Sequence, residues 1–367
     1  MLDEMTSDKL SPLMASASTS VTGREVQLIR YPDGPVCSAD FRVVEVEVPE
    51  PRPGEVLVRN TWMSIDPGLR LRLRANSPEG YFAALPLGHP ITGVMTVGKV
   101  IASRKEGFRE GDTVSHGLGW RDYAVVEAGK EEIGGIGTLR LVDTALAPPQ
   151  AYLSFLGGSG LTAYAGIVHL ADLRPGDVVW VSAAAGAVGT LAAQLAKVRG
   201  HRVVGSAGSD EKVSYLVDEL GLDAAFNYRS GSLPELLREA APEGIDVYFD
   251  NVGGDHLESA LGALRRFGRV VMCGTIAEYD LEAPPPGPCN LFLVVAKELS
   301  IRGLRGNTHA DAIPELWREV GGLLREGRIK SRETIVDGLE NAPVALARLM
   351  RGDTAGKTLV RIAPAEA

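Results

Sequence analysis

Short runs of alternating apolar and polar residues fill the first part of the chain. Examples are EVQLIRY (25–31), FRVVEVEV (41–48) and GEVLVRN (54–60), and turns rich in proline and glycine separate them. Alternation with a period of two is typical of strands that bury one face. Because the strands are short and closely spaced, we predict a partly closed, mostly antiparallel β domain.

The pattern changes near residue 158, where apolar runs begin to alternate with helical stretches. The run DVVWVSA (177–183) has no polar alternation, which suits a strand buried on both faces, and a helix is expected at 187–199. This βαβα series predicts a doubly wound parallel sheet. The further elements expected are strands at 202–206, 224–228, 245–251, 268–274 and 299–303, and helices at 210–220, 233–240, 256–265 and 311–325.

The last residues return to short strands such as 357–362, so the simplest arrangement has the C-terminus completing the first domain. We therefore expect an α/β protein with two domains. The predicted division is a flexible tail at 1–20, a first domain made of 21–157 and 328–367, and a second domain at 158–327.

Composition excludes several classes of protein. The 367 residues carry a net charge of −9 without a basic block, so nucleic acid or an anionic membrane is a poor partner. Cys37, Cys273 and Cys289 lie far apart, which fits a reducing compartment, and no apolar run is long enough to span a membrane. The tail lacks the apolar core of a secretion signal, so a cytoplasmic location is expected.

A glycine motif follows the buried strand and opens the next helix. It reads Ala184-x-Gly186-x-x-Gly189, with alanine in place of the first glycine of G-x-G-x-x-G. Gly186 lets the backbone approach a pyrophosphate, Gly189 lets helix and strand pack closely, and the helix N-terminus favours an anion. Small residues also serve plain helix–sheet packing, but the surrounding βα units favour a dinucleotide site.

The end of the second strand distinguishes the two nicotinamide cofactors. An NAD site usually has an acidic residue there, whereas this strand ends at residues 203–208 without one. Ser209 offers a hydroxyl and Lys212 a positive charge to a 2′-phosphate. Lys212 could also be an ordinary surface lysine. The missing acid favours NADPH.

Eight segments together resemble one family, the zinc-free branch of the medium-chain dehydrogenases/reductases. This branch contains prostaglandin and leukotriene reductases, plant double-bond reductases and the bacterial curcumin reductase. The resemblance covers nearly all of the chain after the tail, and it implies a GroES-like β domain, a Rossmann domain, a cofactor in the cleft between them and often a homodimer. The segments are SIDPGLR (64–70), GLTAY (160–164), VSAAAGAVG (181–189), VVGSAGSDEK (203–212), FNY (226–228), DVYFDNVGG (246–254), FGRVVMCG (267–274) and GLENAP (338–343).

The resemblance also implies residue roles. Tyr279 matches a tyrosine that approaches the substrate carbonyl or the nicotinamide ribose, although packing is an alternative role for its ring. The substrate pocket is expected to include Trp62, Met63, Tyr81 and Tyr279. The cofactor site is expected to include Ala187, Val188, Gly189, Thr190, Ser209, Lys212, Tyr228, Asn251, Cys273, Gly274, Thr275, Ile276, Tyr279, Leu304, Arg305 and Gly306.

Some positions depart from the family pattern. The family often has tyrosine where Trp62 and Gly68 stand, so the shape of the substrate is the property that the resemblance predicts least well. Zinc-dependent relatives have Gly-His-Glu where this chain has Gly-His-Pro around His89, and the cysteine ligands are missing, so we expect no metal. Asp66, before a proline, could be a catalytic carboxylate but is better explained as a helix N-cap.

These inferences predict an NADPH-dependent, zinc-independent reductase of a carbon–carbon double bond conjugated to a carbonyl. Hydride reaches the β-carbon, and hydrogen bonds from Tyr279 and the cofactor ribose stabilise the developing enolate. Tyr279 or water then protonates the α-carbon. An NADPH-dependent quinone reductase of the same superfamily and an NADPH-binding protein with little turnover are the alternatives.

Overall fold

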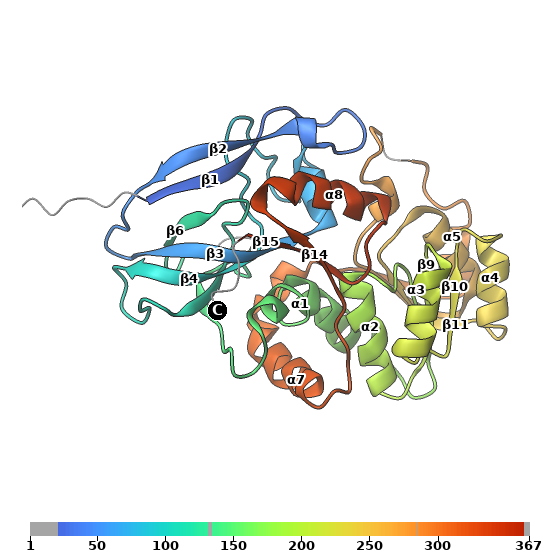
Figure 1. Cartoon of the computed structure of the whole chain (residues 1–367). Coiled ribbons are helices and arrows are strands. Elements are labelled where there is room, and N and C mark those ends of the chain that lie inside the picture. Colours follow the sequence, from blue (N-terminus) through green and yellow to red (C-terminus); the bar gives the residue numbers. More distant parts are fainter. Residues whose placement is uncertain (1–20, 131–133, 284, 363–367) are drawn as a thin grey trace, which may run out of the picture.

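The computed structural model describes residues 21–130, 134–283 and 285–362. The tail predicted at 1–20 lies outside these residues. Two bodies lie side by side, a β-rich body built mainly from the first part of the chain and an α/β body built from the middle (Figure 1). No helix within the described ranges is both long and apolar enough to cross a membrane.

The α/β body is built on a six-stranded parallel sheet in the order β10-β9-β8-β11-β12-β13. The chain moves outward from β8 to β10 and then returns to the other side of β8 with β11, so the order reverses between β8 and β11, where such sheets bind ligands. The doubly wound sheet predicted from the sequence is confirmed. The strands are β8 (Val178–Val181), β9 (Arg202–Ala207), β10 (Ala224–Asn227), β11 (Ile245–Asp250), β12 (Leu264–Met272) and β13 (Ser300–Gly303).

Helices cover this sheet near the predicted places. The helix expected at 256–265 lies at Gly254–Ala263, because the backbone of Leu264 is already extended and starts β12. The α-helices are α1 (Gly158–Tyr164), α2 (Ala187–Val198), α3 (Asp210–Ser214), α4 (Leu233–Ala240), α5 (Gly254–Ala263), α6 (Phe292–Ala296), α7 (Ile313–Arg325) and α8 (Ala342–Arg351). Wider π-helical turns η4 (Ala165–Leu170) and η5 (Tyr215–Glu219) continue α1 and α3. The short 3₁₀ helices are η1 (Ser38–Asp40), η2 (Pro67–Arg72), η3 (Pro149–Leu153), η6 (Ile276–Glu278), η7 (Gly306–Ala312) and η8 (Leu339–Asn341).

The β-rich body contains a seven-stranded sheet and a separate hairpin. The sheet has the order β14-β15-β3-β4-β5-β7, with β6 also paired to β3, while β1 and β2 pair with each other. The strands are β1 (Val21–Leu28), β2 (Phe41–Val48), β3 (Glu55–Ile65), β4 (Thr96–Ser103), β5 (Thr113–His116), β6 (Tyr123–Glu127), β7 (Arg140–Leu141), β14 (Glu333–Asp337) and β15 (Lys357–Arg361).

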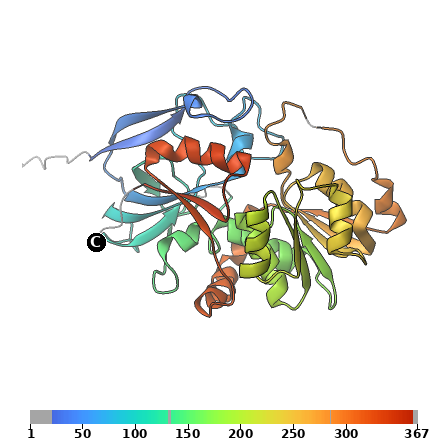
Figure 2. The same ribbon diagram turned by 45° about the vertical axis from the view of Figure 1, so that its right-hand side comes forward.

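The C-terminal segment belongs to this β-rich sheet. β15 pairs antiparallel with β3, from Thr358 opposite Ile65 to Arg361 opposite Trp62, and β14 pairs with β15 in parallel. In both ribbon views the red C-terminal strands lie within the blue and teal body (Figures 1 and 2). The exact division at 157/158 and 327/328 remains a prediction.

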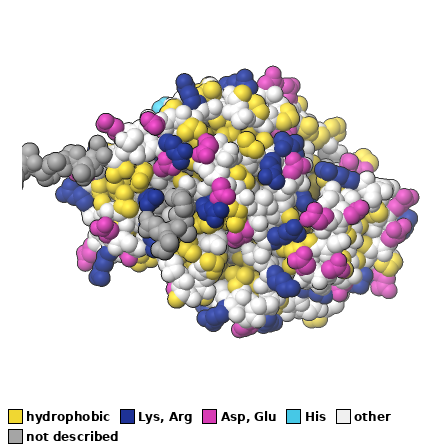
Figure 3. All heavy atoms as spheres, viewed as in Figure 1, with side chains coloured by type: hydrophobic (Ala, Val, Ile, Leu, Met, Phe, Trp, Pro, Cys, Tyr) yellow, Lys and Arg dark blue, Asp and Glu magenta, His cyan; other side chains and the backbone are white. Residues whose placement is uncertain are grey.

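A single hydrophobic cluster crosses the junction between the two bodies. It joins Val97 and Leu359 of the β-rich sheet to Val179 and Leu191 of the α/β body. The free energy gained by burying apolar side chains is roughly proportional to the area removed from water. This shared core therefore stabilises one arrangement of the two sheets. On the outer face drawn in Figure 3, basic and acidic side chains are interspersed rather than grouped by sign.

Gly356 links the two bodies through its backbone, and it tolerates no side chain. Its φ is +66°, and a Cβ would collide with the backbone carbonyl of Arg332. We predict that Gly356→Ala lowers stability by about 2 kcal/mol or more, because a strained backbone and a displaced strand add together. Melting temperature measures this loss. Gly352→Ala is the control, since its φ is +76° but its Cβ enters open space. Equal losses in the two variants would contradict the collision.

Candidate active site

The loop between β8 and α2 forms an anion-binding turn. The first-turn N–H groups of Ala187, Val188 and Gly189 lie at the start of the helix, where they have no intrahelical acceptor. A Cβ on Gly189 would collide with the carbonyl of Ala183, so only glycine permits this close packing. The loop therefore fits the pyrophosphate of a dinucleotide.

Thr190 supports the loop from within. Its side chain is 1% exposed, its hydroxyl donates to the carbonyl of Ala184 at 3.1 Å, and its N–H donates to Gly186 at 2.8 Å. Both donors are thus used inside the protein. In this structure Thr190 holds the loop in place, while the preceding residues present their N–H groups.

The end of β9 carries the residues predicted for a 2′-phosphate. Ser209 is the N-cap of α3, and Lys212 is half-buried with its ammonium donating to the carbonyl of Gly352 at 2.7 Å. A Cβ on Gly208 would stand 3.1 Å from the hydroxyl of Tyr228. The Tyr228 hydroxyl therefore lies against Gly208, just before the helix that carries Lys212.

Two arginines that sequence reasoning missed accompany this group. Burial lowers the pKa of Lys212, and the positive charges of Arg229 and Arg332 lower it further. Arg229 also lies over the ring of Tyr228, with 5.6 Å between its guanidinium carbon and the ring centre. Its position directly after Tyr228 in the sequence could have indicated that Arg229 lies near the cofactor site. Arg332 comes from the C-terminal segment, where no local pattern marks it.

The other end of the cofactor site is formed where β11 and β12 end. The side-chain amide of Asn251 donates to the carbonyl of Ser182 at 2.7 Å, and its backbone N–H donates to the Ser182 hydroxyl at 3.0 Å. The hydroxyl of Tyr248 donates to Asp250 at 2.8 Å beneath them. Asn251 is therefore held in one orientation by buried partners.

The loop after β12 brings a thiol and a phenol to the same end. Burial raises the pKa of the Cys273 thiol to about 12, and the carboxylate of Asp250 adds to the effect. Burial also raises the pKa of Tyr279, so both groups stay protonated at neutral pH. A Cβ on Gly274 would stand 2.9 Å from the Tyr279 hydroxyl, and Thr275 and Ile276 continue the loop into η6.

The segment after β13 lies beside this loop. Leu304 donates its N–H to Met272 at 2.8 Å, and a Cβ on Gly306 would collide with the Thr162 hydroxyl. Between them, Arg305 extends to the β-rich body and donates to the carbonyl of Gly80 at 2.7 Å. The segment therefore connects the cofactor end of the sheet with the substrate side.

The predicted substrate residues have different placements. Trp62 packs half-buried against the cluster that crosses the junction. Met63 is 0% exposed in the core of the β-rich body, and its sulfur accepts from the backbone N–H of Trp120. Neighbouring residues of a strand face opposite sides, so Met63 fills the core rather than an exposed pocket wall. Tyr81 is half-buried, with its hydroxyl against Gly68.

The explanation of Asp66 as a side-chain cap is corrected. Asp66 occupies the N-cap position of η2, but its side chain makes no capping bond. It instead accepts from Lys357 at 2.5 Å and from the hydroxyl of Ser64. Lys357 is 2% exposed and also donates to Ser159 at 3.2 Å, so a buried charge draws the carboxylate away from the helix.

Two arginines of η2 and its continuation reach the loop that carries Tyr279. Arg70 is 3% exposed and donates to Asp280 at 2.6 Å. Arg74 donates to the carbonyl of Tyr279. These contacts fix the position of the Tyr279 loop relative to the β-rich body.

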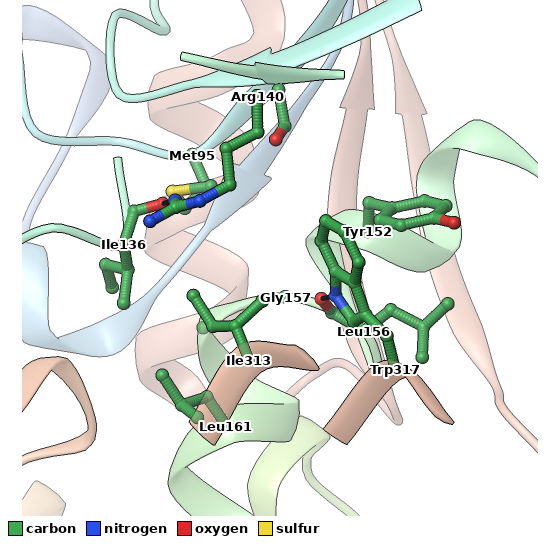
Figure 4. A pocket seen from close by; sticks show the side chains of 11 residues that line it. Met95, Ile136, Arg140, Tyr152, Leu156, Gly157, Leu161, Ile313 and Trp317 are labelled. Carbon is green, nitrogen blue, oxygen red and sulfur yellow. Dashed lines mark hydrogen bonds between the residues drawn. The ribbon is translucent and has the colours of Figure 1, made fainter. Parts of the chain in front are cut away.

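Two hollows in the described part of the chain lie away from the predicted cofactor and substrate residues. One, of about 20 Å³, lies between Met95, Arg140 and Trp317, where Trp317 donates to the carbonyl of Leu156 at 2.8 Å (Figure 4). That volume suits about one water molecule. The other, of about 760 Å³, is a surface groove between α4 and α5 lined by Arg238 and Glu258. Neither hollow touches the predicted catalytic residue.

Metal-binding groups do not gather in the described part of the chain. Within it, no three His, Cys, Asp or Glu side chains lie together as a metal site. His89 follows a glycine with a φ of +74° in the loop before β4. Independence of zinc remains a prediction.

A Rossmann sheet with an anion-binding first turn, joined to a β-rich body at the carboxyl ends of its strands, defines a dinucleotide-binding oxidoreductase. Two family models match the chain, one described as an N-terminal domain of oxidoreductase (24–133) and one as zinc-binding dehydrogenase (187–322). Together with the relatives below, they show that the chain belongs to the medium-chain dehydrogenases/reductases, in the branch that contains prostaglandin and double-bond reductases.

Three known proteins illustrate this relationship. The 2-alkenal reductase (NADP(+)-dependent) of Nicotiana tabacum is 36% identical, covering 93% of this chain and 98% of its own. Prostaglandin reductase 1 of Rattus norvegicus is 35% identical, covering 91% and 97%. The crystal structure of CurA in complex with NADPH from Vibrio vulnificus has a TM-score of 0.85 at 30% identity, covering 93% of this chain and 100% of its own.

We predict that Lys212 binds the 2′-phosphate of NADPH. Lys212→Met should weaken NADPH binding roughly 10-fold or more and leave NADH nearly unchanged, because only NADPH carries that phosphate. Burial and two arginines lower the Lys212 pKa, so its ammonium loses its proton earlier than an ordinary lysine as pH rises. NADPH affinity should therefore fall in the alkaline range.

Fluorescence titration over a pH series measures this effect. Lys212→Arg is the control, because a guanidinium keeps its charge and should keep NADPH affinity constant over the same range. A loss of the same size for NADH and NADPH in Lys212→Met would show that Lys212 is not a phosphate ligand.

Proposed function

We propose that this protein is an NADPH-dependent, zinc-independent reductase of the carbon–carbon double bond in α,β-unsaturated ketones and aldehydes. The observation that carries the proposal is the half-buried phenol of Tyr279, whose hydroxyl lies against Gly274 at the carboxyl end of the sheet that also carries the dinucleotide turn. Relatives named 2-alkenal reductase and prostaglandin reductase support it.

The cofactor site fits NADPH by the chemistry of its donors. Lys212 follows the end of β9, where an NAD site would have a carboxylate, and it interacts electrostatically with Arg229 and Arg332. Arg332 also pairs with Glu211 at 3.1 Å. Gly189 permits the close packing of helix and loop that leaves the first-turn N–H groups free for a pyrophosphate. Asn251, fixed by Ser182, lies at the opposite end, where the nicotinamide half is expected, and its carbonyl accepts from the N–H of Ile276 at 3.3 Å.

When bound, NADPH supplies the hydride that adds to the β-carbon of the enone. The protein must then stabilise negative charge on the carbonyl oxygen without a metal. Tyr279 donates its hydroxyl to this oxygen and holds the substrate in position. Tyr279 or a water molecule delivers the proton to the α-carbon.

Two alternatives stay open, and one assay separates them. An NADPH-dependent quinone reductase of the same superfamily would consume quinones but not enones. A low-turnover NADPH-binding protein would bind NADPH without oxidising it. A screen of NADPH oxidation over enals, enones, prostaglandin-like ketones and quinones distinguishes all three.

We expect NADPH oxidation with enones in this screen, and loss of the conjugated double bond in the product. Tyr279→Phe should lower kcat/KM for a good enone by roughly 10-fold or more, because one oxyanion donor is lost while a ribose hydroxyl or water partly replaces it. NADPH affinity and melting temperature should stay nearly unchanged. An unaltered kcat/KM would exclude Tyr279 from the mechanism.

We further propose that the protein is a cytoplasmic homodimer that pairs through β13. This strand ends the parallel sheet, and Ile301 on it is 37% exposed. Phe292 and Val295 of neighbouring α6 are 76% and 69% exposed. An open strand edge beside apolar side chains is well suited to pairing with a second copy.

Val295→Lys should convert the dimer to a monomer in analytical ultracentrifugation, because it places a charge in the apolar contact. Val344→Lys on α8 is the matched control, since Val344 is 44% exposed on the other body. A monomeric wild type, or a dimer that persists in Val295→Lys, would contradict pairing through this surface.

A further inference from the structure

The space above Gly68 is filled by a phenol from another segment. Gly68 lies in η2, and a Cβ built on it would stand 2.7 Å from the hydroxyl oxygen of Tyr81. The backbone of Gly68 has no positive φ, so no conformational need requires glycine there. The missing side chain instead leaves room for the Tyr81 hydroxyl.

Tyr81 and Tyr279 share one environment although they come from different bodies. Burial raises the pKa of Tyr81, and the nearby carboxylate of Asp66 raises it further, so its hydroxyl is a neutral donor. The η2 segment and its continuation contact both loops. Gly68 lies against the Tyr81 hydroxyl. Arg70 donates to Asp280 at 2.6 Å, and Arg74 donates to the carbonyl of Tyr279. One segment therefore holds both O–H donors where the bodies meet.

Arg305 holds Tyr81 in this position. Its guanidinium carbon lies 5.7 Å from the centre of the Tyr81 ring and 5.2 Å from that of Phe82. The same side chain donates to the carbonyl of Gly80 at 2.7 Å. A cation over an aromatic face is attractive, and the hydrogen bond adds direction. A residue of the segment that borders the cofactor site thus fixes the loop that carries Tyr81.

We propose that Tyr81 is a second hydroxyl donor to the carbonyl oxygen of the substrate, acting opposite Tyr279, and that Arg305 is its positioning residue. This inference rests on the proposed enone reduction. As hydride adds to the β-carbon, the π electrons of the double bond move into an enolate, and both hydroxyls donate to its oxygen. A proton from Tyr279 or water then forms the α C–H bond, so the atoms and charges balance.

The first test removes the hydroxyls singly and together. Tyr81→Phe should lower kcat/KM for a good enone roughly 10-fold, with NADPH affinity and melting temperature unchanged. The double variant with Tyr279→Phe should lose at least the product of the two single losses, because each phenol partly substitutes for the other. Tyr152→Phe is the control, since its hydroxyl donates to the carbonyl of Asp143 away from this site.

Gly68→Ala tests the same contact without touching a phenol. The new methyl group occupies the place of the Tyr81 hydroxyl and displaces it, so kcat/KM should fall about as far as in Tyr81→Phe. Stability should hold or rise, because alanine favours a helix over glycine. Arg305→Met should lower kcat/KM in the wild type but much less in Tyr81→Phe, as expected for a residue that acts through Tyr81.

The outcomes separate this inference from the proposed function. A wild type that reduces no enone would overturn the proposed function. A wild type that reduces enones, with Tyr81→Phe and Gly68→Ala equally active, would overturn only the role of Tyr81. A double variant no slower than Tyr279→Phe alone would also overturn it.

Discussion

The pairing of β15 with β3 is the constraint on which the rest of the site depends. It returns the end of the chain to the first sheet, and the N–H of Gly356 donates to the carbonyl of Ala185 in the phosphate loop at 2.7 Å. This path brings Arg332 and the carbonyl of Gly352 to Lys212, and Lys357 to Asp66. The pairing of β15 with β3 thus places residues both at the adenosine end of the cofactor site and at the junction between the two bodies.

The parts that sequence reasoning predicted well depend on local order. The buried strand, the glycine turn and α2 follow one another directly, so the loop from Ala183 to Gly189 was recognisable. Ser209 and Lys212 lie one helical turn apart at the start of α3, as the local sequence indicated, and their contact with a phosphate stays a prediction. Alternation along strands also predicted the β-rich body correctly.

The parts that could not be predicted depend on long-range packing. Asp66 and Lys357 are 291 positions apart, and only the sheet brings the buried ammonium to the carboxylate that a local pattern assigned to a helix cap. Met63 lies on the core side of β3 because of the register with β15 and β4. Arg305 gave no hint that its side chain would cross to the loop of Tyr81.

The environment of the Cys273 thiol affects how readily this thiol is alkylated. Enones are electrophiles that thiolates alkylate, and the thiolate is the reactive form of cysteine. Burial raises the pKa of Cys273, so a smaller share of this thiol is ionised at neutral pH than of an ordinary cysteine. The environment that raises the pKa of Cys273 should therefore also slow alkylation of this thiol by electrophilic substrates.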